Sequence, residues 1–233
     1  LSTDTAPEYK VPLSGPDITE AERAALMAVL DTRYFSMGQQ VQAFEQAFRD
    51  YFGVKHAIAV SSGTTGLHLC VLAAGIEDGD LVLTTPFSFM ASSNVLLFER
   101  AVPVFVDVDP LTGNIDPALL AAAAADLAEG GDAARRWLPR KGAQSDAKLK
   151  AILPVDVFGQ PADMDPIRAL ADGHGLAVIE DSCEALGAAY KGRHAGLLGD
   201  YGVFAFYPNK QITTGEGGMI VTNDDAAAEY TRA

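Results

Sequence analysis

A single lysine stands between two apolar segments near the carboxyl end of the chain. Residues 203–207 form an apolar, aromatic run that predicts a buried strand, and Pro208 should end it because proline cannot donate to a sheet ladder. Lys210 follows, then a Thr- and Gly-rich turn, and then a second apolar run over residues 219–222. A lysine near apolar surface is poorly solvated as a cation, which frees its amine as a nucleophile toward carbonyl groups. The alternative is an ordinary lysine on a surface loop.

The position of Lys210 favours the chemical interpretation. Turns at the ends of central strands are where α/β proteins bind their ligands, and the neighbouring glycines let the backbone approach a bound group closely. A lysine that forms a Schiff base commonly serves pyridoxal phosphate (PLP). A PLP site needs three further parts: an acid for the pyridine nitrogen, a cradle for the phosphate, and an aromatic side chain that stacks on the ring.

The candidate phosphate cradle follows an expected strand at residues 57–60. The sequence there reads Ser61-Ser-Gly-Thr-Thr-Gly66 and leads into an expected helix, so free N–H groups and the helix dipole should create an anion site. We expect Ser62, Gly63, Thr64 and Thr65 to hold the anion. Ser and Thr also cap helices where no ligand binds, which is the alternative. The segment has neither the Gly-Lys-Ser/Thr of a Walker A loop nor a dinucleotide fingerprint.

The candidate ring-stacking residue and acid follow two other expected strands. Phe89 is our choice for the stacking residue, with Phe87 second, although phenylalanines more often belong to the core. Asp181 directly follows an apolar strand, and a carboxylate there can keep a pyridine nitrogen protonated. Glu184, about one helical turn further on, could reach the ring hydroxyl. A helix N-cap pair is the alternative for Glu180 and Asp181.

Composition narrows the possible classes of protein. The 233 residues include 31 acidic and 17 basic ones, a net charge of −14, which argues against a nucleic-acid-binding protein. Cys70 and Cys183 form no C-x-x-C pair, and the four histidines lack metal-ligand spacing, so we expect neither a disulfide framework nor a metal site. We see no apolar span long enough for a membrane helix and no signal peptide, so we expect a cytoplasmic protein.

The pattern along the chain predicts an α/β fold with a mostly parallel mixed sheet flanked by helices. Residues 1–17 should be extended, and 18–233 should form one large domain. Thr19 and Glu22 suit the start of a first helix, and the apolar positions of a second helix at 39–52 should enter the core. Strands are then expected at 57–60, 81–84, 102–106, 151–155, 177–179, 203–207 and 219–222, and helices at 64–74, 90–98, 117–128, 166–173 and 224–232.

Residues 129–150 differ from the rest because they are rich in Gly, Ala, Arg and Lys. We favour a solvated surface insertion, since connecting segments run over the surface and tolerate insertions. The alternative is a basic flap over an anionic substrate, with Trp137 as a stacking face.

Taken together in this order, the motifs resemble those of the DegT/StrS-type family of PLP-dependent sugar aminotransferases. The resemblance covers nearly the whole chain, beginning with residues 36–41 and continuing through the cradle, Phe89 and the Asp181 segment. It ends with Tyr207-Pro-Asn-Lys210 and the Thr214-Gly-Glu-Gly-Gly218 turn. It implies the large domain of a fold type I PLP-transferase, a homodimer with shared active sites, and a smaller carboxy-terminal domain that would lie beyond this chain.

The resemblance also implies roles for individual residues. Lys210 would form the Schiff base, Asp181 would pair with the pyridine nitrogen, and Phe89 would stack on the ring. Thr64 and Thr65 would hold the phosphate, and Glu184 would sit near the ring oxygen. Many members carry a phosphate-binding serine five residues before the lysine, where this chain has Ala205.

The expected activity is transamination, because dehydratase relatives in this family replace the lysine with histidine. An amino-acid donor, glutamate in our expectation, would supply the amino group, and a nucleotide-linked keto sugar would receive it. Two alternatives stay open: another fold type I PLP enzyme that acts on amino acids, or a non-catalytic fragment that binds PLP or a sugar nucleotide.

Overall fold

The computed structural model describes residues 15–140, 143 and 147–233, so the expected extended segment at 1–17 lies largely outside the described residues. The helices are α1 Glu20–Thr32, α2 Gln39–Phe52, α3 Gly63–Ala73, α4 Ala91–Phe98, α5 Pro117–Glu129, α6 Gly131–Arg135, α7 Met164–His174 and α8 Asp225–Arg232, with a 3₁₀ turn η1 at Val157–Gly159. The strands are β1 His56–Val60, β2 Leu81–Thr84, β3 Val102–Phe105, β4 Leu149–Leu153, β5 Ala177–Asp181, β6 Ala189–Tyr190, β7 Arg193–His194, β8 Tyr201–Ala205 and β9 Gly218–Thr222.

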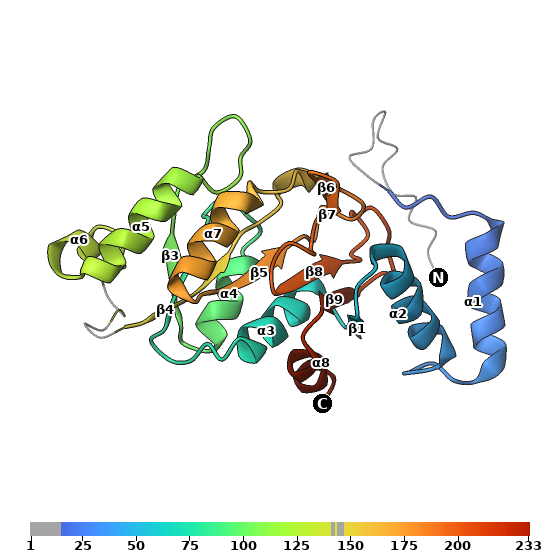
Figure 1. Ribbon diagram of the computed structural model, residues 1–233. Helices are drawn as coiled ribbons and strands as arrows, with labels where there is room; N and C mark the ends of the chain where they lie inside the picture. The colour runs from blue at the N-terminus through green and yellow to red at the C-terminus, as the bar shows by residue number, and fades with distance from the viewer. Residues whose placement is uncertain (1–14, 141–142, 144–146) are drawn as a thin grey trace, which may run out of the picture.

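Seven strands form the main sheet in the order β1-β9-β8-β5-β4-β2-β3 (Figure 1). The neighbours from β8 to β3 pair in parallel, whereas β9 runs antiparallel to both β1 and β8. Every strand of this sheet except β9 therefore points the same way, and the carboxyl ends of those strands lie at one edge. The predicted mostly parallel mixed sheet is confirmed.

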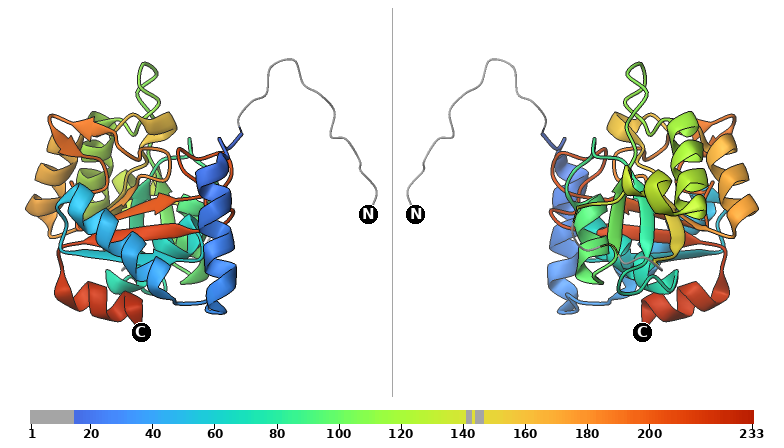
Figure 2. Two further views of the ribbon diagram at one scale, coloured as in Figure 1. Left: turned by 90° about the vertical axis from the view of Figure 1, so that its right-hand side faces the viewer. Right: turned by 90° about the vertical axis from the view of Figure 1, so that its left-hand side faces the viewer.

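Helices cover both faces of the sheet, as the end-on views of Figure 2 show. Val203 and Ile220 pack on one face with the apolar residues of α3, α4 and α8. Phe204 and Met219, one position along in each strand, pack on the other face with α2, and α5 and α7 cover the rest of that face. Both faces of each central strand are buried, which explains why these strands read as continuous apolar runs.

The ends of several elements follow from local chemistry. Thr19 and Glu22 form the predicted capping box at the start of α1, and α2 and β2 have the predicted bounds. β8 ends at Ala205, two residues earlier than predicted. The backbone leaves the ladder there because the Phe206 carbonyl accepts a hydrogen bond from the Thr214 N–H, which closes the turn that carries Lys210.

Three short elements were missed by the sequence analysis: the β6–β7 hairpin, α6 and the 3₁₀ turn η1. α6 belongs to the unusual segment at 129–150, of which residues 141–142 and 144–146 lie outside the described part. The Trp137 indole N–H donates to Asp126 of α5, and its ring packs against the core beside α5 and α7. The Arg136 guanidinium lies over that ring, 5.0 Å from its centroid. Trp137 is thus a packing residue, which favours the surface insertion over the substrate flap.

α1 stands at one end of the molecule (Figure 1). No residue of α1 is buried by the described part of the chain, and Leu26, Met27 and Leu30 are each more than half exposed. These apolar side chains therefore form a surface that the described part of the chain leaves uncovered.

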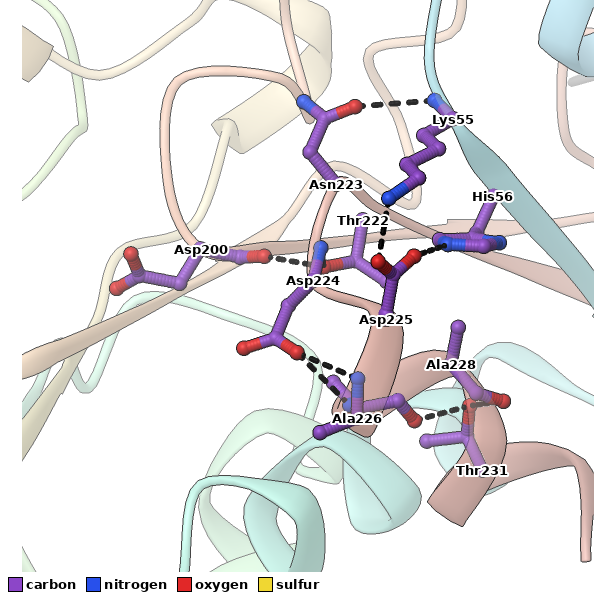
Figure 3. A network of polar contacts seen from close by, with 11 residues as sticks. Lys55, His56, Asp200, Thr222, Asn223, Asp224, Asp225, Ala226, Ala228 and Thr231 are labelled. Atoms are coloured by element: carbon purple, nitrogen blue, oxygen red, sulfur yellow. Dashed lines mark hydrogen bonds and ion pairs between the residues drawn. The ribbon is translucent and has the colours of Figure 1, made fainter.

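A polar network joins the start of β1 to the end of β9 and the start of α8 (Figure 3). The Lys55 N–H donates to the Asn223 side chain at 3.0 Å, and Lys55 and His56 both contact the carboxylate of Asp225. These contacts lower the pKa of the Asp225 carboxyl, chiefly through the hydrogen bond from Lys55. Asp224 caps α8 by accepting hydrogen bonds from two N–H groups of its first turn. Figure 3 thus shows how β1 is held against the last strand.

Within the described residues, the helices are too short or too polar to cross a bilayer.

We predict that Gly202→Ala destabilises the fold. A Cβ atom on Gly202 would lie 2.0 Å from the Gly196 carbonyl oxygen, so β8 and the loop after β7 would have to separate. We expect the free energy of unfolding to fall by about 3 kcal/mol in denaturant titrations. Gly173→Ala in α7 is the control, because its Cβ would meet no atom within 4 Å and alanine favours helices. Equal stability of the two variants would contradict the packing argument.

Candidate active site

A cavity of about 860 Å³ opens at the edge of the sheet where the parallel strands end. Its walls come from the segments that follow β1, β2, β4, β5 and β8, and from the turn before β9. Seven of the eight predicted site residues line it: Ser62, Gly63, Thr64, Phe89, Asp181, Glu184 and Lys210. The eighth, Thr65, follows Thr64 in the chain but does not line the cavity. Its hydroxyl contacts those of Ser61 and Ser62.

Lys210 reaches into this cavity from the turn after β8. Its side chain is 16% exposed, and its ammonium nitrogen donates to Glu184 Oε1 at 2.9 Å. The other Glu184 oxygen accepts a hydrogen bond from the Phe158 N–H at 3.1 Å. Glu184 therefore holds the lysine amine in a fixed position within the cavity.

Asp181 stands at the carboxyl end of β5 and is almost fully buried. Its Oδ2 accepts a hydrogen bond from the Ser92 hydroxyl at 2.6 Å, and the Cys183 N–H contacts Oδ1 at 3.3 Å. Alternation along β5 sends the preceding residue, Glu180, to the other side of the strand. Of these two neighbouring carboxylates, Asp181 is the one that lines the cavity.

The first turn of α3 offers an anion site. Ser62 caps the helix, because its hydroxyl accepts the Thr65 N–H at 3.0 Å. Within the described residues, the N–H groups of Gly63 and Thr64 have no hydrogen-bond partner, and they are the ones left to meet an anion. Both interpretations of Ser62 are therefore compatible: it caps the helix and lines the cavity.

Close packing explains the glycine in that turn. A Cβ atom on Gly63 would lie 2.8 Å from both the Ala205 Cβ and the Cys183 Sγ, so a larger residue would push α3 away from β8. Ala205 faces this contact with a methyl group and offers no hydroxyl. Burial raises the pKa of the Cys183 thiol well above its usual value, which keeps the thiol protonated and unreactive.

Three phenylalanines stand around the cavity. Phe89 is 75% exposed, and the rings of Phe87 and Phe158 meet edge to face with centroids 5.9 Å apart. Phe158 was missed by the sequence analysis, although it precedes a glycine in the loop after β4. It adopts a left-handed backbone with φ of 52°, a conformation that costs free energy and is held here by its N–H bond to Glu184.

Two further buried carboxylates, Asp156 and Glu180, lie close to this site. Asp156 lines the cavity and accepts hydrogen bonds from the Ser182 hydroxyl at 2.6 Å and the Ala162 N–H at 2.9 Å, and burial raises its pKa to about 6. Glu180 is fully buried and accepts three backbone N–H groups of residues 196–199. Burial raises the pKa of Glu180 to about 8, against the effect of those three donors. Sequence analysis missed Asp156 because no motif marks it and its side-chain partner, Ser182, comes from the segment after β5.

The family model of the DegT/DnrJ/EryC1/StrS aminotransferases matches residues 16–233, so the chain belongs to that family. PLP is the cofactor of the family. The predicted resemblance is confirmed.

Individual relatives agree with this assignment. The chain is 44% identical to GDP-perosamine synthase from Caulobacter vibrioides over 96% of this chain and 55% of the relative. The structure of an aminotransferase from Psychrobacter cryohalolentis superposes with a TM-score of 0.80 at 38% identity, over 93% of this chain and 50% of that one. Helicobacter pylori PseC, an aminotransferase of pseudoaminic acid biosynthesis, gives 0.79 at 30% identity, over 95% and 54%. The chain spans about half the length of these relatives.

The residues of the cavity fit PLP. The cofactor carries an aldehyde, a basic ring nitrogen and a phosphate, and the cavity brings together an amine, a buried carboxylate and two free N–H groups at a helix start. Gly63 packs closely against Ala205 on one side, so a phosphate group could approach the start of α3 only from the cavity.

We predict that Asp156 gives the protein a specific dependence of stability on pH. Its pKa is about 6 in the folded protein and 3.8 ordinarily, so the folded state holds the proton more tightly. The contribution of Asp156 to stability should therefore decrease as pH rises from about 4 to about 6. Asp156→Asn cannot ionise, and across this window the wild type should lose on the order of 3 kcal/mol of unfolding free energy relative to the variant.

Denaturant titrations of the protein without cofactor at several pH values test this prediction. Asp31→Asn, on the exposed surface of α1, serves as the control and should keep the wild-type pH profile. An unchanged profile in Asp156→Asn would contradict the prediction.

Proposed function

We propose that the protein is a PLP-dependent aminotransferase that moves an amino group from an amino acid, glutamate in our proposal, to a nucleotide-linked keto sugar. The observation that carries this proposal is the convergence of Lys210, Asp181 and the open N-terminus of α3 on one cavity. Family membership and the relatives that act in amino-sugar biosynthesis support it. In this proposal residues 18–233 are the PLP-binding large domain.

The proposed roles follow from the positions of the side chains. When bound, PLP supplies an electron sink that stabilises negative charge at the substrate carbon. Lys210 acts as the nucleophile that attaches the cofactor, and its amine later carries a proton at Nζ as general acid and base. Glu184, 2.9 Å away, orients that amine and would hold the ring oxygen of the cofactor. A carboxylate held this close also keeps the released ammonium within the cavity.

The remaining residues bind and orient the cofactor. The negative charge of Asp181 favours a protonated ring nitrogen. Ser62, Gly63, Thr64 and Thr65 form the phosphate cradle around the start of α3, with Thr65 acting through the hydroxyl of Ser62. Phe89 would stack on the ring.

We predict that Lys210→Ala abolishes amino transfer. Removing both the nucleophile and the proton carrier should lower the turnover rate by about 10³-fold or more. Borohydride reduction of the PLP-loaded wild type, followed by peptide mapping, should place the cofactor on Lys210. Lys191→Ala, which removes a lysine with an exposed side chain, should keep full activity. Retained transamination in Lys210→Ala would refute the proposal.

Substrate assays separate the proposed function from its alternatives. Loaded enzyme should accept an amino group from glutamate and pass it to a keto sugar linked to a nucleotide, and 2-keto acids should be poor acceptors. The reverse preference would favour an amino-acid aminotransferase. Cofactor binding without any transfer in the full-length protein would favour a non-catalytic binding protein.

We also propose that the protein is a homodimer. The uncovered apolar side chains of α1 and of the turn after it (Leu26, Met27, Leu30, Tyr34, Phe35, Met37) form the kind of surface that subunits bury. Sedimentation should give a dimer mass for the wild type, and Leu30→Asp should shift the equilibrium toward monomer by about tenfold or more. A monomeric wild type would contradict the proposal.

A further inference from the structure

A chain of hydroxyl groups leads from the cavity wall to Asp181. Ser88 lines the cavity in the loop before α4, and its hydroxyl lies 2.6 Å from that of Ser92. Ser92, in the first turn of α4, is 1% exposed and donates to Asp181 Oδ2 at 2.6 Å. The contact joins residues 89 positions apart in the sequence and ties α4 to the end of β5.

Counting protons fixes the direction of this chain. The Ser92 hydroxyl lies 2.6 Å from Asp181 Oδ2 and 3.3 Å from the Phe89 carbonyl oxygen, and both of these oxygens only accept. Its single proton is therefore given to the nearer, charged acceptor, Asp181. The Ser92 oxygen can then only accept from Ser88, which makes Ser88 the donor in that contact. Both hydroxyls therefore direct their protons toward the carboxylate, and each bond strengthens the next.

We infer that Ser92 is a positioning residue that fixes the rotation of the Asp181 carboxylate so that it meets the ring nitrogen of PLP. This inference rests on the proposed function. A carboxylate at the end of a side chain turns freely about its last bond unless a partner holds one oxygen. The other contacts of the Asp181 carboxylate within the described residues come from Cys183, through its N–H at 3.3 Å and its thiol, so the 2.6 Å bond from Ser92 is the strongest restraint on the plane of the carboxylate.

A second serine on the same helix provides a matched control. Ser93 follows Ser92 directly, but its hydroxyl donates to the Met90 carbonyl at 3.2 Å and it does not line the cavity. Serine-to-alanine changes at both positions have the same effect on helix propensity. A difference between them therefore reports the contact with Asp181.

The test measures the dissociation constants of PLP and of its deaza analogue, in which a C–H group replaces the ring nitrogen. Both are measured by absorbance titration or equilibrium dialysis with the full-length protein. Ser92→Ala should raise the dissociation constant of PLP by about five- to tenfold, since a hydrogen bond to a charged group no longer orients Asp181. It should change that of the deaza analogue less than about twofold. Ser92→Thr, which keeps the hydroxyl, and Ser93→Ala should both behave as the wild type.

Two results would overturn the inference. One is a Ser92→Ala protein that binds PLP as tightly as the wild type. The other is an equal loss for both ligands, which would mean that Ser92 only supports the local structure. If Ser92→Ala does not fold, Ser92→Cys keeps the size of the side chain with a weaker donor and must show the same selective loss.

Failure of the proposed function has a separate signature. If the wild type does not bind PLP, or binds PLP and the deaza analogue equally, then Asp181 does not pair with the ring nitrogen and the proposed function itself fails. If the wild type binds PLP more tightly than the deaza analogue and Ser92→Ala does the same, then only the inference about Ser92 fails.

Discussion

The common direction of the strands is the constraint on which the site depends. Every strand of the main sheet except β9 points toward one edge, and the segments that follow β1, β2, β4, β5 and β8 meet there. Together they contribute helix N–H donors, aromatic rings, the carboxylates of Asp156, Asp181 and Glu184, and the Lys210 amine. Residues from 62 to 217 thereby share one cavity, although no two of the segments are adjacent in the chain.

Much of this arrangement could be predicted from the sequence because its signals are local. Buried strands read as apolar runs, and capping residues such as Thr19 mark helix starts. Lys210 and Asp181 were found because each follows such a run directly. The rule that parallel strands present their carboxyl ends together then places them at one edge. Phe89 was harder to choose, since an apolar ring gives the same signal in a core as beside a ligand.

The groups that sequence reasoning missed depend on contacts between distant segments. Ser92 looks like any serine in a helix, and only the folded chain brings it to Asp181. Asp156 follows β4 without a motif, and its burial depends on Ser182 from the segment after β5. The uncovered face of α1 could not be foreseen either, because an amphipathic pattern predicts that a face will be buried and does not name its partner.

The network of Figure 3 has a consequence for how the protein is made. β1 lies at one edge of the sheet, and its ladder is formed with β9 alone, so the contact of Lys55 with Asn223 spans 168 positions. During synthesis β1 is made long before β9, so its backbone cannot form its ladder until nearly the whole of this chain has been synthesised. Until then an apolar strand with unpaired N–H and C=O groups is open to wrong pairings, and the yield of native protein depends on keeping that strand covered.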